Sequence, residues 1–433
     1  MSGSADQSGP GEGRTEQPAS ASASAEGASP ASGESAPRRG PLAGVRVLEL
    51  GSLIAGPFSG RILADFGAEV LKIEPPGVGD PLRTWSLVTE HGSLWALTQS
   101  RNKQSITVDL RTAEGREIVR KLALQSQVVI ENFRPGRMEE WGLGFEQLAQ
   151  ENPALVMVRI SGFGQTGPYS HRPGFGNIAE SMGGIRYITG WPDRPPLRVG
   201  LSIGDSIAAL YAVIGTMMAL REAERTGHGQ VVDVSLAESV FSMLEAIVPE
   251  YGYDGRVRER TGNLLGGAAP TNMYPTADDR WLAIGANGDG IFKRFTAAIG
   301  QPELADDPRF NSNQARRANV EALDTLIAEW TRARTLDDAM VVLDAADVPA
   351  GPVYSVKDIA EDPQYQAREM LVDVPDARLG SLLMPGVVPK LSRTPGEVRA
   401  AGPDLGAQTL TVLGALLGMD ADQLAALQER KVI

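Results

Sequence analysis

The sequence predicts an α/β protein with a large Rossmann-like domain, built on a mostly parallel sheet, and a smaller α+β domain. Short apolar strands alternate with helical segments through residues 45–160, which is typical of βαβ units. The pattern changes between residues 261 and 351, where a Gly-, Ala- and Pro-rich loop precedes mostly helical segments. The length of 433 residues accommodates both domains.

The first βαβ unit begins near residue 45. Residues 45–50 (VRVLEL) and 69–74 (EVLKIE) read as strands, and a short helix is predicted between them at residues 58–66. Further strands are predicted at residues 105–110, 128–131 and 155–160, with a helix at 113–125. Parallel sheets bind ligands beyond the carboxyl ends of their strands. The segments after Leu50, Leu110 and Glu131 are therefore candidate binding segments.

The second half of the chain carries a long predicted helix at residues 206–225, whose apolar first half we expect to be buried. A strand at 230–236 and a helix at 237–247 follow. The smaller domain is predicted to contain a strand at 281–285 and helices at 290–299, 320–333 and 336–345. The tail has few periodic segments before residues 407–417, so we expect it to run back across the large domain.

These patterns divide the chain into five predicted segments. Residues 1–39 contain no Leu, Ile, Val or aromatic residue and are expected to be a disordered tail, because they cannot bury enough apolar surface to offset ordering entropy. The chain shows neither a signal-peptide core nor an uninterrupted apolar run of about 18 residues. We expect a soluble cytoplasmic protein that does not bind membranes. The remaining segments are a large domain at 40–235, a linker helix at 236–265, a small domain at 266–352 and a return segment at 353–433.

The composition excludes several kinds of chemistry. With no cysteine there is no thiolate nucleophile, disulfide or zinc–cysteine site, and the three dispersed histidines offer little to a metal. We expect no metal site. The net charge of −13 argues against a general affinity for nucleic acids or anionic membranes. A local basic pocket for an anionic small molecule is still compatible with that charge.

Two segments at predicted strand ends are candidate ligand-binding loops. Residues 51–57 (GSLIAGP) lack a complete G-x-G-x-x-G motif, but small residues before a helix fit phosphate or adenine groups. A tight strand-to-helix turn explains the same residues. Residues 131–137 (ENFRPGR) place two arginines and an asparagine after a strand, where they could bind phosphates or simply form a solvated basic turn.

Two further segments are candidates for the reaction itself. Asp205 lies in GLSIGDS at the start of the long helix, where it is either an N-cap or a carboxylate that backbone N–H groups keep ionised for nucleophilic attack. Residues 263–270 (NLLGGAAP) form a small-residue loop, which either closes over a site or links two domains. The residues alone leave both pairs of interpretations open.

Taken in order, these segments resemble the class III CoA-transferases, the CaiB/BaiF family that includes formyl-CoA transferase and its dicarboxylate-using relatives. The resemblance runs from Pro41 to the C-terminus and depends on the joint order of its pieces. The pieces are PLAGVRVLELGSLIAGP, FGAEVLKIEPPGVGDPLR, RNKQSITVDLRT, ENFRPG, RISGFGQTGPYSHRPGF, IGDSIAALYAVIG, RTGHGQVVDVSL and LGMDADQLAALQERKVI.

The resemblance implies functional residues, a substrate and an assembly. It places the nucleophilic aspartate on Asp205 and a shielding loop on Gly266 and Gly267. It implies a CoA thioester as substrate, no tightly bound cofactor, and an interlocked homodimer. The implied CoA contacts are Ile54, Ala55, Val108, Asp109, Leu110, Arg111, Asn132, Phe133, Arg134, Gly174, Phe175 and Gly176.

The sequence departs from the family pattern at two places. Pro75 stands where formyl-CoA transferases often carry an arginine, so Arg83, Arg134 or Arg137 would have to replace that phosphate contact. The α-methylacyl-CoA racemases of the same family carry G-H-D where Gly174, Phe175 and Gly176 stand here, so the missing histidine disfavours racemisation.

The closest resemblance is to members that move CoA from succinyl-CoA to dicarboxylates such as glutarate, citramalate or malate. RTGN at residues 260–263 and the run TNMYPT are among the segments that suggest it. The alternatives are an acyl-CoA racemase or dehydratase of the same fold, and a non-catalytic CoA-binding protein in which Asp205 only caps a helix. A distal carboxylate needs a cation, and the candidates are Arg186, Arg198, Arg258 and Arg260.

Overall fold

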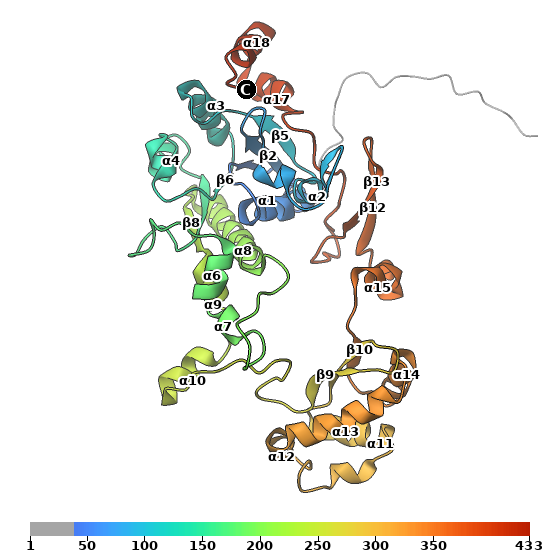
Figure 1. Cartoon of the computed structure of the whole chain (residues 1–433). Helices are drawn as coiled ribbons and strands as arrows, with labels where there is room; N and C mark the ends of the chain where they lie inside the picture. Colours follow the sequence, from blue (N-terminus) through green and yellow to red (C-terminus); the bar gives the residue numbers. More distant parts are fainter. Residues whose placement is uncertain (1–38) are drawn as a thin grey trace, which may run out of the picture. The chain divides into compact units, whose positions relative to one another are not determined.

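The large sheet has six parallel strands, which confirms the predicted sheet (Figure 1). The computed structural model describes residues 39–433, so nearly all of the tail predicted to be disordered lies outside the described residues. The strand order is β5-β2-β1-β6-β7-β8, so the order reverses beside β1 and a crevice forms between the ends of β1 and β6. The strands are β1 (Arg46–Glu49), β2 (Glu69–Glu74), β5 (Gln104–Thr107), β6 (Val128–Glu131), β7 (Val156–Ser161) and β8 (Val231–Ser235).

Helices cover both faces of this sheet because its strands are apolar on both faces. Val47 belongs to the core on one face and its neighbour Leu48 to the core on the other, as the alternation of side chains along a strand requires. The first face carries α1 (Ala55–Asp65), α6 (Gly176–Met182), α8 (Ile203–Thr226) and α9 (Leu236–Phe241). The second carries α3 (Ala113–Leu124), α5 (Phe145–Ala149), α17 (Thr409–Leu417) and α18 (Ala421–Glu429).

Residues 271–352 form a second core around an antiparallel sheet of three strands. Phe292, Phe295 and Phe310 are fully buried in this core. The elements that contribute to it are β9 (Thr271–Pro275), β10 (Trp281–Gly285), β11 (Ala350–Pro352), α11 (Asp289–Ala298), α13 (Val320–Arg332) and α14 (Leu336–Ala345).

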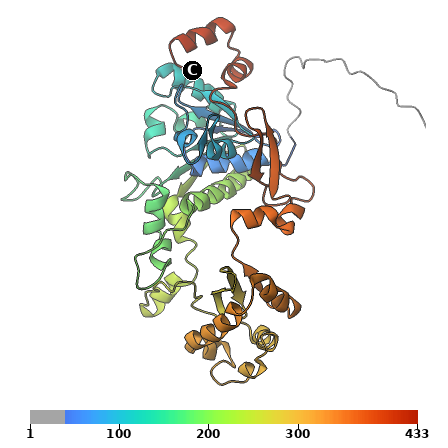
Figure 2. The same cartoon turned by 45° about the vertical axis from the view of Figure 1, so that its right-hand side comes forward.

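The C-terminal segment is hydrogen-bonded to the outer strand of the large sheet. Thr107 N–H donates to Thr409 Oγ1 at 2.9 Å, and Asp109 N–H, just beyond β5, donates to Val432 O at 2.8 Å. These contacts satisfy backbone groups that an edge strand would otherwise expose. Figure 2 shows the same C-terminal segment, in orange and red, beside the large sheet, including the hairpin β12 (Leu371–Asp376) and β13 (Gly380–Pro385).

The prediction that the apolar half of the long helix is buried holds for one face, which includes Ile207 and Ala208, and is wrong for the other. Leu210, Ile214 and Met218 are 48–67% exposed, and they lie on one face because they are spaced by four residues. The buried face of α8 consists largely of small residues such as Ala208 and Ala212, which let the helix approach the sheet closely. α8 is also long and apolar enough to cross a membrane, a property that core helices share.

Several other elements differ from the sequence-based prediction. The helix expected at residues 237–247 ends at Phe241, and α10 (Ile247–Asp254) follows a break at Glu245, which has a positive φ of 50°. Position 245 carried no glycine or proline to mark a break. The helix expected at 58–66 begins three residues earlier, at Ala55, because Pro57 fits the first turn of a helix. The strand β9 and the hairpin β12–β13 were not predicted, since prolines at their ends weaken the strand pattern.

Candidate active site

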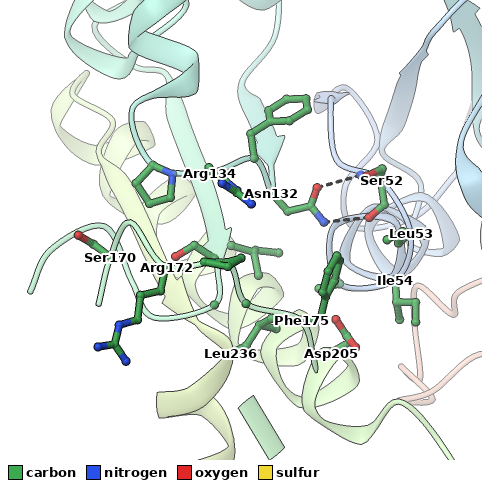
Figure 3. A pocket seen from close by; sticks show the side chains of 18 residues that line it. Ser52, Leu53, Ile54, Asn132, Arg134, Ser170, Arg172, Phe175, Asp205 and Leu236 are labelled. Carbon is green, nitrogen blue, oxygen red and sulfur yellow. Dashed lines mark hydrogen bonds between the residues drawn. The ribbon is translucent and has the colours of Figure 1, made fainter. Parts of the chain in front are cut away.

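A pocket lies at the carboxyl ends of β1, β6 and β7, where the strand order predicts a ligand site (Figure 3). Its walls come from segments far apart in the sequence, and Asp205 at the start of α8 forms part of its lining. The other lining residues are Ser52, Leu53, Ile54, Ala55, Asn132, Phe133, Arg134, Pro135, Ile160, Ser161, Gly162, Ser170, Arg172, Pro173, Gly174, Phe175 and Leu236.

The first wall is the turn between β1 and α1. Asn132 bonds Ser52 twice, accepting its N–H at 2.9 Å and donating Nδ2–H to its carbonyl at 2.8 Å (Figure 3). Leu53 has a left-handed φ of 65°, and its N–H donates to Asp80 Oδ1 at 3.0 Å. Ile54 is the N-cap of α1, which begins at Ala55. This segment is thus a tight turn that also forms a pocket wall.

The second wall is the turn after β6. Phe133 N–H donates to Glu131 Oε2 at 2.7 Å, and Glu131 is buried and paired with Arg159 at 2.8 Å. The turn therefore holds Arg134 at the pocket, where it is exposed. No salt bridge to Arg134 is found among the residues that the structure describes. Its charge is available to an anionic ligand.

Asp205 is the third residue of α8, so the interpretation of this residue as an N-cap is wrong. The N-cap is Ser202. The carboxylate of Asp205 lies directly against the backbone of Gly176: a Cβ built on Gly176 would be 2.0 Å from Asp205 Oδ2. Only glycine leaves room for the carboxylate in this position. Figure 3 shows Asp205 beside Phe175 and below the Asn132–Ser52 contact.

A second carboxylate, Glu180 on α6, lies beneath the start of α8. Glu180 is 1% exposed, accepts the Gly204 N–H at 3.3 Å and pairs with Arg186 at 2.9 Å. Glu180 was not predicted as a site residue, although its position four residues after Gly176 on one helix was a usable signal.

Burial raises the pKa of Asp205 to about 6, and the charge of Glu180 contributes to the rise. Its own backbone N–H and the charge of Arg198 act in the opposite direction. The expected stabilisation of the ionised form by the helix end is therefore outweighed by burial. At pH 7 and above the carboxylate is still mostly ionised, and a raised pKa makes a carboxylate a stronger base.

Comparison with known proteins decides the family. The model of CoA-transferase family III matches residues 42–409. The chain belongs to CoA-transferase family III. It is 53% identical over 394 residues to the succinyl-CoA–D-citramalate CoA-transferase of Chloroflexus aurantiacus, covering 91% of this chain and 98% of that protein. It is 41% identical to the succinyl-CoA–L-malate CoA-transferase alpha subunit of Chloroflexus aurantiacus, with coverage of 91% and 92%.

The fold comparison agrees with the family match. The crystal structure of a CaiB/BaiF family protein from Brucella suis superposes with a TM-score of 0.79 at 36% identity, covering 88% of this chain and 100% of that structure. The protein is therefore an enzyme that transfers CoA, and CoA thioesters are its substrates. Among the described residues, no group of three His, Asp or Glu side chains is arranged to hold a metal ion.

The pocket brings together nine of the residues that the family resemblance implies. Eight of them line the pocket, and Gly176 lies against Asp205. They are Ile54, Ala55, Asn132, Phe133, Arg134, Gly174, Phe175, Gly176 and Asp205.

Other implied contacts do not line this pocket. Val108 and Leu110 pack in the core on the second face of the sheet, and the exposed Arg111 pairs with Asp109 at 2.8 Å. Gly266 lines a separate cavity together with Gln314 and Arg317. The carbonyl of its neighbour Gly267 accepts a hydrogen bond from Asn313 at 3.0 Å.

The arginines proposed to replace the residue missing at Pro75 differ in their availability. Arg83 is bound to buried Glu74, with Nε 2.7 Å from Oε1, and Arg137 pairs with Glu140 at 2.7 Å. Arg134 is the member of the three that lines the pocket. Arg172, which sequence analysis missed, lines it as well and lies over the Tyr169 ring at 3.8 Å.

The position of Glu180 predicts a pH effect in this CoA-transferase. Glu180→Gln removes a negative charge near Asp205 and keeps an oxygen for the Gly204 N–H. We expect the pKa of Asp205 to fall, so that the acidic limb of the kcat/KM profile, expected near pH 6 in the wild type, moves to lower pH. Arg186, released from Glu180, acts in the same direction.

The matched control for this pH profile is Glu222→Gln. It breaks an exposed salt bridge with Arg225 on α8, the helix that carries Asp205. It should leave the acidic limb in place. An acidic limb that stays in place in the Glu180→Gln variant, or moves to higher pH, contradicts the prediction.

Proposed function

We propose that this enzyme moves CoA from succinyl-CoA to a small dicarboxylic acid such as citramalate or malate, with Asp205 as the nucleophile. The observation that carries the proposal is a half-buried carboxylate with a raised pKa, which lies in a pocket at the ends of parallel strands. The donor and acceptors are supported by the names of the relatives that are 53% and 41% identical.

The reaction proceeds through two kinds of intermediate on Asp205, an acyl anhydride and a CoA thioester. A carboxylate oxygen attacks the thioester carbonyl of succinyl-CoA, the C–S bond breaks, and a succinyl-aspartyl anhydride and CoA thiolate form. The thiolate attacks the aspartyl carbonyl carbon and releases succinate, which leaves an aspartyl-CoA thioester. The acceptor carboxylate then repeats these steps in reverse and leaves as its CoA thioester. One thioester is exchanged for another, so no ATP is needed.

The structure supplies groups suited to these steps. The first-turn N–H groups of α1, at Ala55 and Gly56, have no acceptor within their own helix and can stabilise an oxyanion near the pocket wall. Arg134 and Arg172 supply positive charge for the CoA phosphates. Water must be kept from every intermediate. The family resemblance implies the Gly266–Gly267 loop for that role, and we propose that this loop, which lines a separate cavity in the single chain, closes over the pocket during the reaction.

Recognition of the distal carboxylate is proposed to fall to Arg198. Three of the four candidate arginines already have partners within the chain. Arg186 and Arg258 form salt bridges, with Glu180 at 2.9 Å and with Glu250. Arg260 donates a hydrogen bond to the Tyr187 carbonyl at 2.8 Å. Arg198 is exposed, and its positive charge lowers the pKa of Asp205.

Arg198→Gln is therefore expected to raise KM for succinate about 10- to 100-fold, the loss of one charge-assisted hydrogen bond. KM for butyrate, which has the same length and one carboxylate, should change little. Arg194→Gln, at another exposed arginine of the same segment, serves as the control and should change neither value. An unchanged KM for succinate in the Arg198 variant contradicts the assignment.

We further propose that two chains form a homodimer, in the interlocked arrangement implied by the family resemblance. Leu210, Ile214 and Met218 expose an apolar face of α8, and exposed apolar residues also lie on α10, as expected of a surface that a second chain covers. Sedimentation equilibrium should give a particle with twice the chain mass of 46.0 kDa. A stable monomer at micromolar concentration contradicts this proposal.

A panel of acids tests the proposed substrates. Purified enzyme with succinyl-CoA should form the CoA thioesters of citramalate, malate or glutarate, as measured by chromatography. Activity with monocarboxylates such as formate or carnitine alone would contradict dicarboxylate use. Exchange of the α-hydrogen for deuterium without any acceptor acid would favour a racemase instead.

A further inference from the structure

Four charged side chains are buried beneath the first wall of the pocket, and the reaction described above uses none of them. They are Glu49 on β1, Lys72 on β2, Asp80 before the short 3-10 helix Pro81–Thr84, and Lys103 before β5, and each is at most 6% exposed. Lys72 pairs with Glu49 at 3.0 Å and with Asp80 at 2.8 Å. Lys103 pairs with Glu49 at 2.7 Å. We call these four residues the charge cluster.

The charge cluster is bonded to the backbone of residues 51–57 at three points. Lys72 Nζ donates to the Gly51 carbonyl at 3.1 Å, and Lys103 Nζ donates to the Pro57 carbonyl at 2.6 Å. Between them, the Leu53 N–H donates to both oxygens of Asp80, at 3.0 and 3.1 Å. The charge cluster thus holds the turn that lines the pocket from its buried side.

The turn needs such support because its conformation is unfavourable on its own. Leu53 has a φ of 65°, in the left-handed region that a leucine rarely adopts. Asp80 binds the N–H of this same residue. Without that contact, we expect the turn to relax and to carry the first turn of α1 away from the pocket.

Stability is a poor explanation for the charge cluster. Burying four charges costs desolvation energy, and replacing buried ion pairs by apolar side chains is often neutral or stabilising. The fold also leaves space for the Glu49 carboxylate by placing a glycine against it: a Cβ on Gly60 of α1 would be 1.9 Å from Glu49 Oε2. Both the buried charges and the glycine against Glu49 are explained if the charged groups set the position of a reactive site.

We propose that the charge cluster is a positioning device for CoA transfer, which holds residues 51–55 in the conformation that faces Asp205 and excludes water from the reaction. The proposal rests on the proposed function in that it takes Asp205 as the reacting group. Asp80 is a positioning residue, since it acts through Leu53 and does not itself line the pocket.

The test measures how each variant divides succinyl-CoA between transfer of CoA to the acceptor acid and hydrolysis to free CoA. Asp80→Ala is expected to lower kcat about 10- to 100-fold, as misplaced catalytic groups do, and to raise hydrolysis per transfer at least about 5-fold. Asp80→Asn keeps an oxygen for the Leu53 N–H and should show the same changes to a smaller extent. It also keeps the test open if the alanine variant does not fold.

Asp65→Ala is the matched control. Asp65 is a buried carboxylate paired with Arg101 at 2.6 Å, and Arg101 also bonds the Pro385 carbonyl rather than the pocket turn. This variant should lower the melting temperature and leave the ratio of hydrolysis to transfer unchanged. An equal rise of that ratio in the Asp65 and Asp80 variants would overturn the proposal, because the effect would then follow from lost stability.

A double-mutant cycle connects Asp80 to Leu53. Glycine adopts a φ of 65° without strain, so Leu53→Gly should make the turn less dependent on Asp80. The loss of kcat caused by Asp80→Ala should be at least about 3-fold smaller in the Leu53→Gly background than in the wild type. If the kcat losses caused by Asp80→Ala and Leu53→Gly simply multiply in the double variant, the proposal is overturned. If the wild type forms no Asp205 intermediate, the proposed function fails instead, whatever the cycle shows.

Discussion

Asp205→Asn is expected to abolish CoA transfer, with kcat reduced by at least about 1,000-fold, because an amide cannot form the acyl anhydride or the CoA thioester. The substitution preserves volume, so acyl-CoA should still bind with nearly unchanged affinity. Transfer rates with succinyl-CoA and a dicarboxylate, together with a binding titration of the non-reacting enzyme, separate the two effects.

Loss of fold would not explain that result. The pKa of Asp205 is raised in the folded state, so its ionised form destabilises the fold above the unfolded-state pKa, and the full cost is present above about pH 6. Asparagine carries no charge, and the variant should melt at or above the wild-type temperature at pH 8. Asp193→Asn, at an exposed site in the segment before α8, is the control and should keep full activity. Near-wild-type transfer by Asp205→Asn would refute the assignment of the nucleophile.

Gly176→Ala is expected to have the second largest effect, lowering kcat by roughly 100-fold, because a displacement of about 1 Å in a reacting group can cost that much. The added Cβ would lie 2.0 Å from Asp205 Oδ2, so the carboxylate must move. Alanine favours helix more than glycine does, so α6 itself should not be weakened. Steady-state kinetics should show the loss mainly in kcat.

The control for the added methyl group is Gly252→Ala in α10. A Cβ at Gly252 meets no atom within 4 Å, and the substitution raises helix propensity in the same way. This variant should retain normal kcat. Wild-type activity in Gly176→Ala would mean that the carboxylate does not need its place against the Gly176 backbone.

The large sheet was predictable because its strands are short, apolar runs separated by helical periodicity. Val47 and Leu48 serve opposite cores, so their strand needs no polar face, and such runs are easily recognised. The position of the pocket followed from the same pattern, since ligands bind where parallel strands end. The family assignment came from resemblance, and the cytoplasmic location stays a prediction.

Features that depend on tertiary context were not predictable. Helix α8 has the apolar sequence of a core helix, but it buries a face made largely of alanines. Leu210 and Met218, on another face, are therefore exposed. The raised pKa of Asp205 depends on burial that no local pattern reveals and, to a smaller extent, on the charge of Glu180, 25 residues earlier. The charge cluster joins residues from four separate segments, and nothing in the sequence around Lys72 or Asp80 marks them as partners.

The covalent intermediate on Asp205 is the most direct test of the mechanism. Wild-type enzyme should be mixed with succinyl-CoA without acceptor, quenched in acid, digested and examined by mass spectrometry. The peptide containing Asp205 should gain the mass of CoA less one water, and the corresponding peptide of Asp205→Asn should show no such gain. An active enzyme in which this peptide stays unmodified, or in which CoA is attached to another residue, would contradict the mechanism.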